Sequence, residues 1–214
     1  MIRRIGCRAH DYGKDTIEVL TKKMSEDSYR TTQLALRKAL SYEVELSIKP
    51  NYDKIRHIKE VMALENIDIA VLGAYLNYAH PDYDTREENL RTLSQHLHIA
   101  NDIGARMVGT ETGSLDPLYK AHKNNHGEAA YLRFKEAIEG VMPIAFHRDT
   151  YMAVEAVAHH IIHSPESMIR LIEAINDERL KVIFDINNMM TIENIHEQEG
   201  MIHQMFDTLD EQIW

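Results

Sequence analysis

The chain has 214 residues, of which 44% are hydrophobic, so it can bury one sizeable core. Its formal net charge of −10 disfavours a DNA or RNA partner, because phosphate backbones are bound by clustered Lys and Arg side chains. Cys7 is the only cysteine, which excludes an intrachain disulfide. The sequence shows neither a secretory signal nor an apolar run of about 18 residues. We therefore predict a cytoplasmic protein without a membrane span.

Short apolar runs alternate with longer amphipathic segments along the chain, which is the pattern of βα units. The predicted strands are Arg4–Cys7, Thr32–Leu36, Asp68–Leu72, Arg106–Gly109, Tyr151–Glu155 and Lys181–Asp185. The predicted helices are Thr16–Ser25, Tyr52–Glu65, Thr85–Ile103, Gly127–Ile144, Pro165–Ile175 and Glu197–Leu209. Ser164 before Pro165, and Gly104 after a helical run, have the residue types of helix caps.

The spacing of the strands favours one continuous architecture. Strand starts recur about every 30 to 45 residues, which is the length of a βα unit, and no linker divides the chain. An open doubly wound sheet and a closed TIM-type (β/α) barrel both fit this pattern. The open sheet usually has a glycine-rich phosphate loop after its first strand, and Gly6–Asp11 is not one. We therefore predict an α/β fold of the barrel type.

Polar side chains stand at the end of each predicted strand, which in a barrel is the active face. In chain order they are His10 and Asp11, Gln33 and Lys38, Tyr75 and Asn77, Glu111, Glu155 with His159 and His160, and Asp185 with Asn187 and Asn188. Glu155 and Asp185 each close a mostly apolar run, where a charge is poorly solvated unless it meets a cation or hydrogen-bond donors. A shared divalent metal would stabilise both carboxylates.

Simpler interpretations compete with this one. A carboxylate at a strand end often caps a helix or pairs with a nearby Lys or Arg. His159 and His160 are adjacent, so only one can face a pocket. His96 and His98 belong to one amphipathic segment, and we expect both at the surface or at an interface.

Three stretches, Val108–Gly113, Ala153–His160 and Val182–Met190, resemble the sugar phosphate isomerase/epimerase family of the xylose isomerase-like TIM barrel superfamily. The resemblance covers essentially the whole chain. It implies a single barrel domain over residues 1–214 with about six of eight βα units, truncated before strands seven and eight. The pair Ile213–Trp214 looks like the beginning of a seventh strand.

The resemblance also implies a site. Family members hold a divalent metal, commonly Mn, Mg, Co or Zn, with four side chains from strands five to eight. Glu155 matches the ligand of the fifth strand and one of the two acid/base residues, and Asp185 matches the ligand of the sixth strand. The ligands of the seventh and eighth strands have no counterpart in the chain. We assign His10, Glu111, His160 and Asn188 to substrate binding.

Three functions remain open from the sequence. The first is a metal-dependent sugar or sugar phosphate isomerase/epimerase that moves a proton through an enediolate intermediate. The second is a metal phosphodiesterase similar to endonuclease IV, which the net charge disfavours. The third is a catalytically inactive barrel fragment that binds a polyol or a partner chain. Relatives often form dimers or tetramers, so a homo-oligomer is an open expectation.

Overall fold

The computed structural model describes residues 5–44, 46 and 50–213 of the chain. Its six strands form one parallel sheet in the order β1-β2-β3-β4-β5-β6. Their bounds are β1 (Cys7–Arg8), β2 (Thr31–Leu34), β3 (Asp68–Gly73), β4 (Ala105–Glu111), β5 (Tyr151–Glu155) and β6 (Leu180–Ile183). Each strand thus pairs with the next one in the sequence, as in a TIM-type barrel, and six βα units are present.

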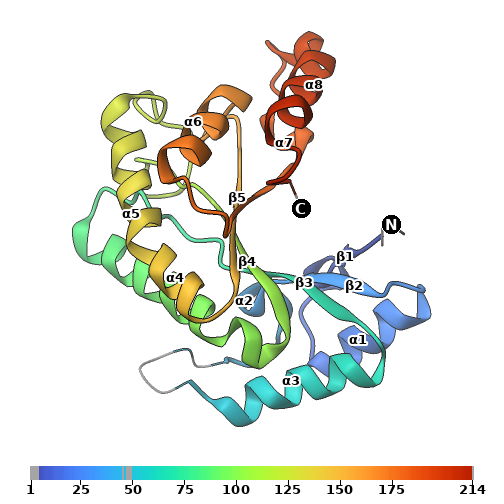
Figure 1. The fold of residues 1–214 in the computed structure, drawn as a ribbon. Helices are drawn as coiled ribbons and strands as arrows, with labels where there is room; N and C mark the ends of the chain where they lie inside the picture. The colour runs from blue at the N-terminus through green and yellow to red at the C-terminus, as the bar shows by residue number, and fades with distance from the viewer. Residues whose placement is uncertain (1–4, 45, 47–49, 214) are drawn as a thin grey trace.

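Helices connect the strands and cover the sheet (Figure 1). The long helices are α1 (Ile17–Glu26), α3 (Tyr52–Leu64), α4 (Tyr83–Ile103), α5 (Glu128–His147), α6 (Pro165–Ile175) and α8 (Gln198–Leu209). The shorter elements are η1 (Ala9–Tyr12), α2 (Leu36–Ala39), α7 (Ile186–Met189) and η2 (Ile195–Glu197). The Ser164 side chain accepts a hydrogen bond from the Ser167 amide and Gly104 adopts a left-handed conformation, so both predicted caps are confirmed.

Five of the six predicted strands have different bounds in the structure, and only Tyr151–Glu155 matches. The third and fourth strands are slightly longer than predicted, and the other three end or begin elsewhere. The second ends at Leu34, because the chain turns directly into α2. The sixth ends at Ile183, and Asp185 instead caps α7. The first is confined to Cys7–Arg8, and Arg4, where we placed its start, lies outside the described residues.

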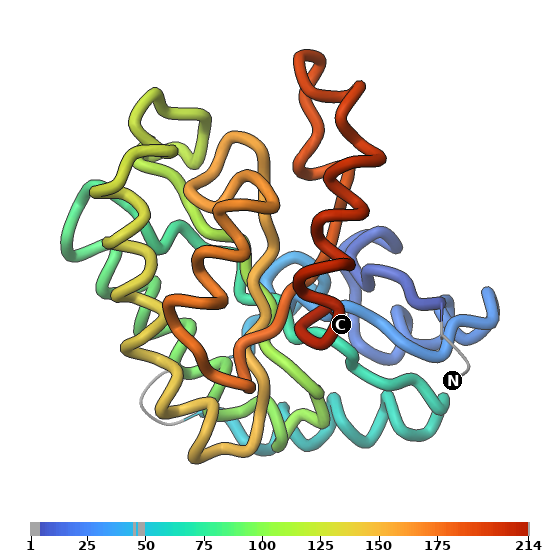
Figure 2. The backbone as a smooth tube through the Cα atoms, turned by 45° about the horizontal axis from the view of Figure 1, so that its top comes forward, coloured from blue at the N-terminus to red at the C-terminus, as the bar shows by residue number. Residues whose placement is uncertain are grey.

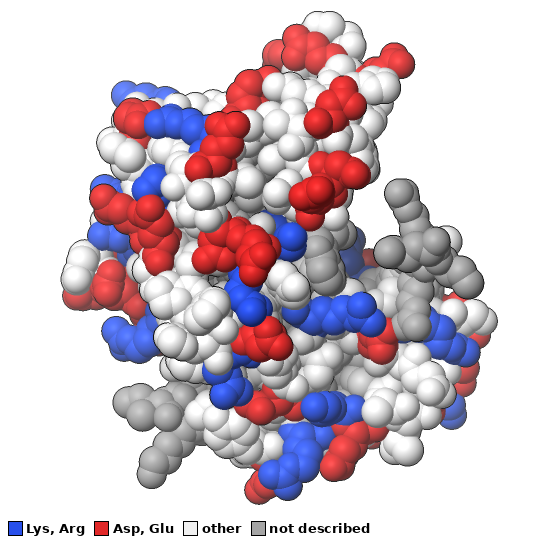
Figure 3. Space-filling view, in the orientation of Figure 1, with Lys and Arg blue, Asp and Glu red and all other residues white. Residues whose placement is uncertain are grey.

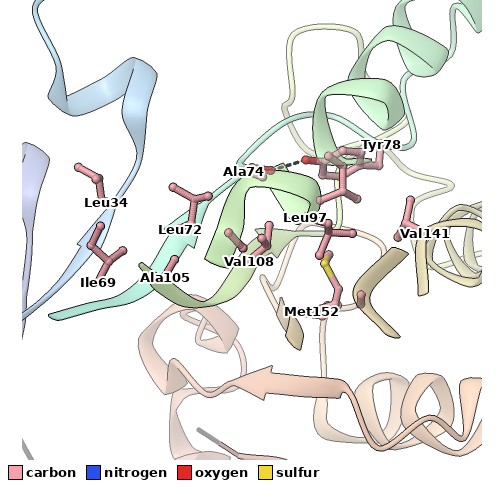
Figure 4. Packing of buried hydrophobic residues seen from close by; sticks show 14 of the residues in the cluster. Leu34, Ile69, Leu72, Ala74, Tyr78, Leu97, Ala105, Val108, Val141 and Met152 are labelled. Atoms are coloured by element: carbon pink, nitrogen blue, oxygen red, sulfur yellow. Dashed lines mark hydrogen bonds between the residues drawn. The ribbon is translucent and has the colours of Figure 1, made fainter. Parts of the chain in front are cut away.

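The core lies between the outer face of the sheet and the helices. Figure 4 shows Leu72, Val108 and Met152 of the strands packed near Leu97 of α4 and Val141 of α5, in one buried cluster. Leu72, Val108, Met152 and Leu97 are 0% exposed. Full burial of a side chain of this size contributes about 1.5 to 3 kcal/mol to folding. The opposite, inner face of the strands is left to form the site.

The expectation that His96 lies at the surface was wrong. His96 is 5% exposed because α4 packs against β4, α3 and α5. Its Nδ1 donates a hydrogen bond to the Thr92 carbonyl at 2.7 Å, and burial lowers the pKa of the ring to about 4. The ring is therefore a neutral part of the core at pH 7.

The segment after β6 rises away from the rest of the chain (Figure 2). It is anchored by α8 against α6. Within the segment, the rings of Phe184 and Phe206 have centroids 5.5 Å apart. At its end, Ile213 forms a parallel bridge with Val182 of β6, and the Val182 amide donates to the Gln212 carbonyl at 2.8 Å. This pairing agrees with the expected start of a seventh strand, although Trp214 lies outside the described residues.

Acidic side chains gather over the end of the molecule that α8 forms, whereas Lys and Arg are mixed with Asp and Glu over most of the remaining face (Figure 3). The sequence from Val182 to Trp214 contains no Lys or Arg. Within the described part of the chain, none of the helices combines the length and apolar character needed to cross a bilayer.

We predict that Gly113→Ala destabilises the protein by at least about 1 to 3 kcal/mol. Gly113 follows β4 with φ at +89°, and an added Cβ would meet Asn77 Oδ1 at 2.6 Å. Gly140→Ala is the matched control, because Gly140 is exposed within α5 and a Cβ there meets nothing within 4 Å. It should stabilise the protein by about 0.5 to 1 kcal/mol. Urea denaturation measures both, and equal effects of the two substitutions would contradict this account.

Candidate active site

A cavity of about 510 Å³ opens at the carboxyl ends of the strands, inside the curve of the sheet. It is lined by side chains from every strand or from the loop that follows it. They are Arg8, His10, Gln33, Lys38, Val71, Tyr75, Glu111, Glu155, Ile183, Phe184, Asp185, Ile186 and Asn188. Five of the six residues that the sequence assigned to a site, all except His160, are in this set.

The inner face of β4 is tightly packed at Gly109. Gly109 lies one inward-facing position before Glu111 on β4, and a Cβ there would meet Cγ1 of Val71 at 2.5 Å and Cδ1 of Ile183 at 2.7 Å. The side chains of Val71 on β3 and Ile183 on β6 therefore approach the β4 backbone closely, one inward-facing position below Glu111.

Two carboxylates stand side by side at the ends of β4 and β5. Glu111 and Glu155 are direct partners in the parallel register, so both side chains leave the sheet on the same face. Glu155 is 7% exposed. Burial, reinforced by the negative charges of Glu111 and Asp185, raises its pKa from 4.5 to about 7, although the Asn188 amide opposes this shift. Glu155 therefore lies in an environment that favours a cation or a proton.

Asn188 links Glu155 to the third carboxylate, Asp185. Its side-chain Nδ2 donates to Glu155 Oε1 at 2.5 Å, and its backbone amide donates to Asp185 Oδ1 at 3.3 Å. Asp185 Oδ1 also accepts from the Asn187 amide at 2.9 Å, so this carboxylate caps α7. Asp185 therefore fits both interpretations drawn from the sequence. It caps a helix with one carboxylate oxygen, and it also lines the cavity that it shares with Glu155.

Glu111 is held from behind by Tyr119, and the His160 ring packs against the Tyr119 ring with centroids 4.6 Å apart. The Tyr119 hydroxyl donates to Glu111 Oε2 at 3.0 Å, and His160 Nδ1 lies 3.6 Å from the same oxygen. His160 is 2% exposed, and burial, together with His159, lowers its pKa to about 4, so the neutral ring makes no ion pair with Glu111 at pH 7. His159 is exposed, as expected when one of two adjacent histidines faces inward. His160 packs behind the cavity wall and does not line the cavity.

A buried polar network fixes the loop that brings Tyr119 to this place. Asn77 Oδ1 accepts from the Ser114 amide at 2.9 Å, and Asn125 Oδ1 accepts from the Leu115 amide at 2.9 Å. Asn125 Nδ2 also donates to Ser114 Oγ at 2.9 Å. Tyr119 itself has φ at +63°, a left-handed conformation that a bulky residue adopts only when its surroundings impose it.

The opposite wall of the cavity is basic and amide-bearing. It consists of Arg8, His10 and Lys38, together with Gln33, whose amide donates to the Tyr75 hydroxyl. His10 Nδ1 is buried and has no hydrogen-bond partner among the described residues. Burial and the nearby Lys38 and Arg8 lower the pKa of His10, which leaves its ring neutral at pH 7.

The residues that could hold a metal are Glu155 and Asp185. Both offer carboxylate oxygens to the same cavity, which is the donor type that Mg²⁺ and Mn²⁺ prefer. Among the described residues, no group of three or more His, Cys, Asp or Glu side chains is arranged to hold a metal ion. The donor type of these two carboxylates fits a divalent cation, and they are the two residues that would hold it.

The sequence interpretation missed Arg8 and Tyr119. Arg8 lies within Gly6–Asp11, which was considered only as a phosphate loop, and its place beside the cavity follows from β1 pairing with β2. Tyr119 lies in a Lys- and Asn-rich connection that carries no motif. No local signal in the sequence links Tyr119 to Glu111, because their contact depends on the buried network around Asn77 and Asn125.

Comparison with known proteins gives a consistent family. The family described as xylose isomerase-like TIM barrel matches residues 8–208. No curated protein sequence matches. A D-psicose 3-epimerase from Clostridium cellulolyticum H10, solved with D-tagatose, shares 14% identity at a TM-score of 0.74, over 97% of this chain and 71% of that chain.

Two further solved structures have the same fold. A 3-keto-D-glucoside 4-epimerase from E. coli is 13% identical at a TM-score of 0.72, over 98% of this chain and 77% of that one. A xylose isomerase-like TIM barrel protein from Mycobacterium smegmatis, solved with magnesium, is 14% identical at a TM-score of 0.69, over 94% and 72% of the two chains. Identities this low establish a shared fold.

The raised pKa of Glu155 predicts a pH-dependent stability difference between Glu155→Gln and the parent protein, with metals chelated. The folded state keeps the Glu155 proton up to about pH 7, whereas the unfolded chain releases it near 4.5. The parent therefore loses stability as pH rises through this window, and the glutamine variant does not lose this contribution.

The variant should gain about 2 to 3 kcal/mol relative to the parent between pH 5 and 8, as measured by urea denaturation. The histidines titrate in both proteins, so their contributions cancel. Glu199→Gln, at a side chain that is 93% exposed, should show no such trend. A difference between Glu155→Gln and the parent that does not change with pH would show that Glu155 is ordinarily ionised in the folded protein.

Proposed function

The chain belongs to the xylose isomerase-like TIM barrel family, and from this premise we propose that it acts as a metal-dependent isomerase or epimerase of sugars or sugar phosphates. The observation that carries the proposal is the group of carboxylates in one mouth of the barrel. Asn188 bonds to both Glu155 and Asp185, so these two side chains are near neighbours. Epimerases among the structural neighbours support the reaction class.

The ligand roles follow from the donor set. Glu155 and Asp185 would hold a divalent cation, which, when bound, polarises a sugar carbonyl and acidifies the adjacent C–H. Asn188 would orient Glu155 by donating a hydrogen bond to its Oε1. The backbone amides of Asn187 and Asn188 would fix Asp185 in the same way.

Proton transfer is the proposed task of Glu155. Its pKa of about 7 lies in the range in which a carboxyl group both takes up and releases a proton at neutral pH. Glu155 is 7% exposed, so little of this group contacts bulk water. Glu111, held by Tyr119, would accept a hydrogen bond from a sugar hydroxyl, and His10 and Gln33 would bind hydroxyls from the opposite wall.

His160 takes a different place in this scheme from the one that the sequence suggested. Since it lies behind Glu111 and outside the cavity lining, we propose that it positions Glu111 and does not contact the sugar directly. The net charge of −10 disfavours the phosphodiesterase alternative, because a DNA substrate is bound by clustered Lys and Arg. A zinc cluster needs several closely spaced ligands, and the described residues hold no group of three.

Solvent exchange of a ketose proton tests the proposal. The chain is incubated with Mn²⁺ in D₂O with D-fructose, D-psicose, D-tagatose or D-fructose 6-phosphate, and deuterium at the carbons beside the carbonyl is followed by NMR. We expect incorporation into at least one ketose and a loss of at least about 100-fold in Glu155→Gln. The exposed control Glu199→Gln should exchange at the parent rate. No exchange with any ketose, or full exchange in Glu155→Gln, would contradict the proposal.

A further inference from the structure

Tyr75 lies in a seat that a glycine leaves open. A Cβ at Gly73, the last residue of β3, would meet the Tyr75 ring at 2.6 and 3.0 Å, so a larger residue there would displace the ring. At the other end of the ring, the Tyr75 hydroxyl lies 3.8 Å from the place that a Cβ of Gly109 on β4 would take. The ring therefore extends from the end of β3 and carries its hydroxyl to the inner face of β4.

Two side chains hold the ring in this place. Gln33 of β2 donates a hydrogen bond from its amide to the Tyr75 hydroxyl. The Lys38 ammonium lies 4.9 Å from the ring centroid, within the range of a cation–π contact. A phenylalanine would fill the same seat and keep the contact with Lys38. Packing alone therefore does not account for a hydroxyl that a glutamine amide orients.

The hydroxyl lies close to the two carboxylates at the ends of β4 and β5. Gly109 is one inward-facing position before Glu111, and its register partner Ala153 is one inward-facing position before Glu155. Tyr75, Glu111 and Glu155 line the same cavity. Burial, reinforced by the negative charges of Glu155 and Glu111, raises the pKa of Tyr75, so its hydroxyl keeps its proton at pH 7.

A phenol in this arrangement is a directed hydrogen-bond donor. Its oxygen can accept one hydrogen bond and still donate its own proton. Since Gln33 supplies the accepted bond, the proton is left for an acceptor in the mouth of the barrel. When a ketose loses the proton beside its carbonyl, negative charge develops on the carbonyl oxygen, and a fixed donor at that oxygen stabilises the charge.

We propose that Tyr75 is a catalytic residue that donates a hydrogen bond to the carbonyl oxygen of the bound sugar and stabilises the charge that develops there. The inference rests on the proposed function and adds to it a residue on the wall opposite Asp185. The proton that leaves the sugar C–H goes to Glu155, and the Tyr75 proton stays on its own oxygen.

A simpler interpretation is that the Tyr75 hydroxyl donates to Glu155 and only orients this carboxylate. Asn188 already donates to Glu155 Oε1 at 2.5 Å, so one oriented donor is present without Tyr75. The two interpretations differ for an anionic ligand that needs no proton transfer. A donor to the substrate oxygen holds such a ligand, whereas a residue that only orients Glu155 does not.

Calorimetric titration of the full chain with Mn²⁺ present tests the donor directly. The ligand is D-threonohydroxamate, a sugar-like hydroxamic acid whose anion carries two adjacent oxygens like those of the ionised ketose, and D-fructose is the neutral comparison. We expect Tyr75→Phe to weaken hydroxamate binding about tenfold or more and fructose binding less than about threefold, because hydrogen bonds to charged groups are the stronger ones. Tyr83→Phe is the matched control, since Tyr83 is 63% exposed and does not line this cavity.

Ketose exchange gives a second, kinetic readout. Tyr75→Phe should lower kcat by about 100-fold and leave KM nearly unchanged, because the contact strengthens only as charge develops. Tyr83→Phe should exchange at the parent rate.

Each outcome decides a separate question. Equal hydroxamate binding by the parent and Tyr75→Phe overturns the assignment, and a lowered exchange rate beside it would show that Tyr75 only orients Glu155. A raised KM with unchanged kcat, or a parent that binds no hydroxamate, would overturn it as well. Hydroxamate binding that is lost in Tyr75→Phe, in a chain without ketose exchange, would keep the donor and refute the isomerase.

Discussion

The parallel register of β4 and β5 fixes the chemistry of this site. It sets Glu111 directly beside Glu155, and strands in a sheet are only about 4.8 Å apart, so two carboxylates must share one wall. A third, Asp185, follows on the next strand. Burial of Glu155, together with the like charges of Glu111 and Asp185 beside it, raises its pKa to about 7. The fold tolerates the cost of these like charges because the carboxylates accept hydrogen bonds from amide and hydroxyl groups. A bound cation would offset most of the remaining repulsion between them.

The hydrogen bonds around the carboxylates stabilise these neighbouring negative charges. Asn188 uses its side chain for Glu155 and its backbone for Asp185, and Tyr119 reaches Glu111 from a loop held by Asn77 and Asn125. These contacts fix the direction of each carboxylate without neutralising it. Arg8 supplies positive charge from the far wall, so the mouth is polarised across its width.

Periodicity was enough to locate most of the fold, and residue type at strand ends was enough to locate most of the site. Tyr151–Glu155 and Pro165–Ile175 have the predicted bounds, because each is an apolar run with clear end signals. The short helices α2 and α7 were invisible, since four residues carry no period. The burial of His96 also escaped prediction, because a helix packed on several sides buries polar residues that its own pattern assigns to solvent. Tyr119 depends on contacts between distant segments, which no local pattern encodes.

The account depends on Glu155 and Asp185 acting together on one divalent cation. Electron paramagnetic resonance of Mn²⁺ added to the full chain tests this most directly, because bound and free Mn²⁺ are resolved without any substrate. We predict one bound ion in the parent protein, lost separately in Glu155→Gln and in Asp185→Asn and retained in Glu199→Gln. A parent that binds no Mn²⁺, or binding that survives both site substitutions, would contradict the account.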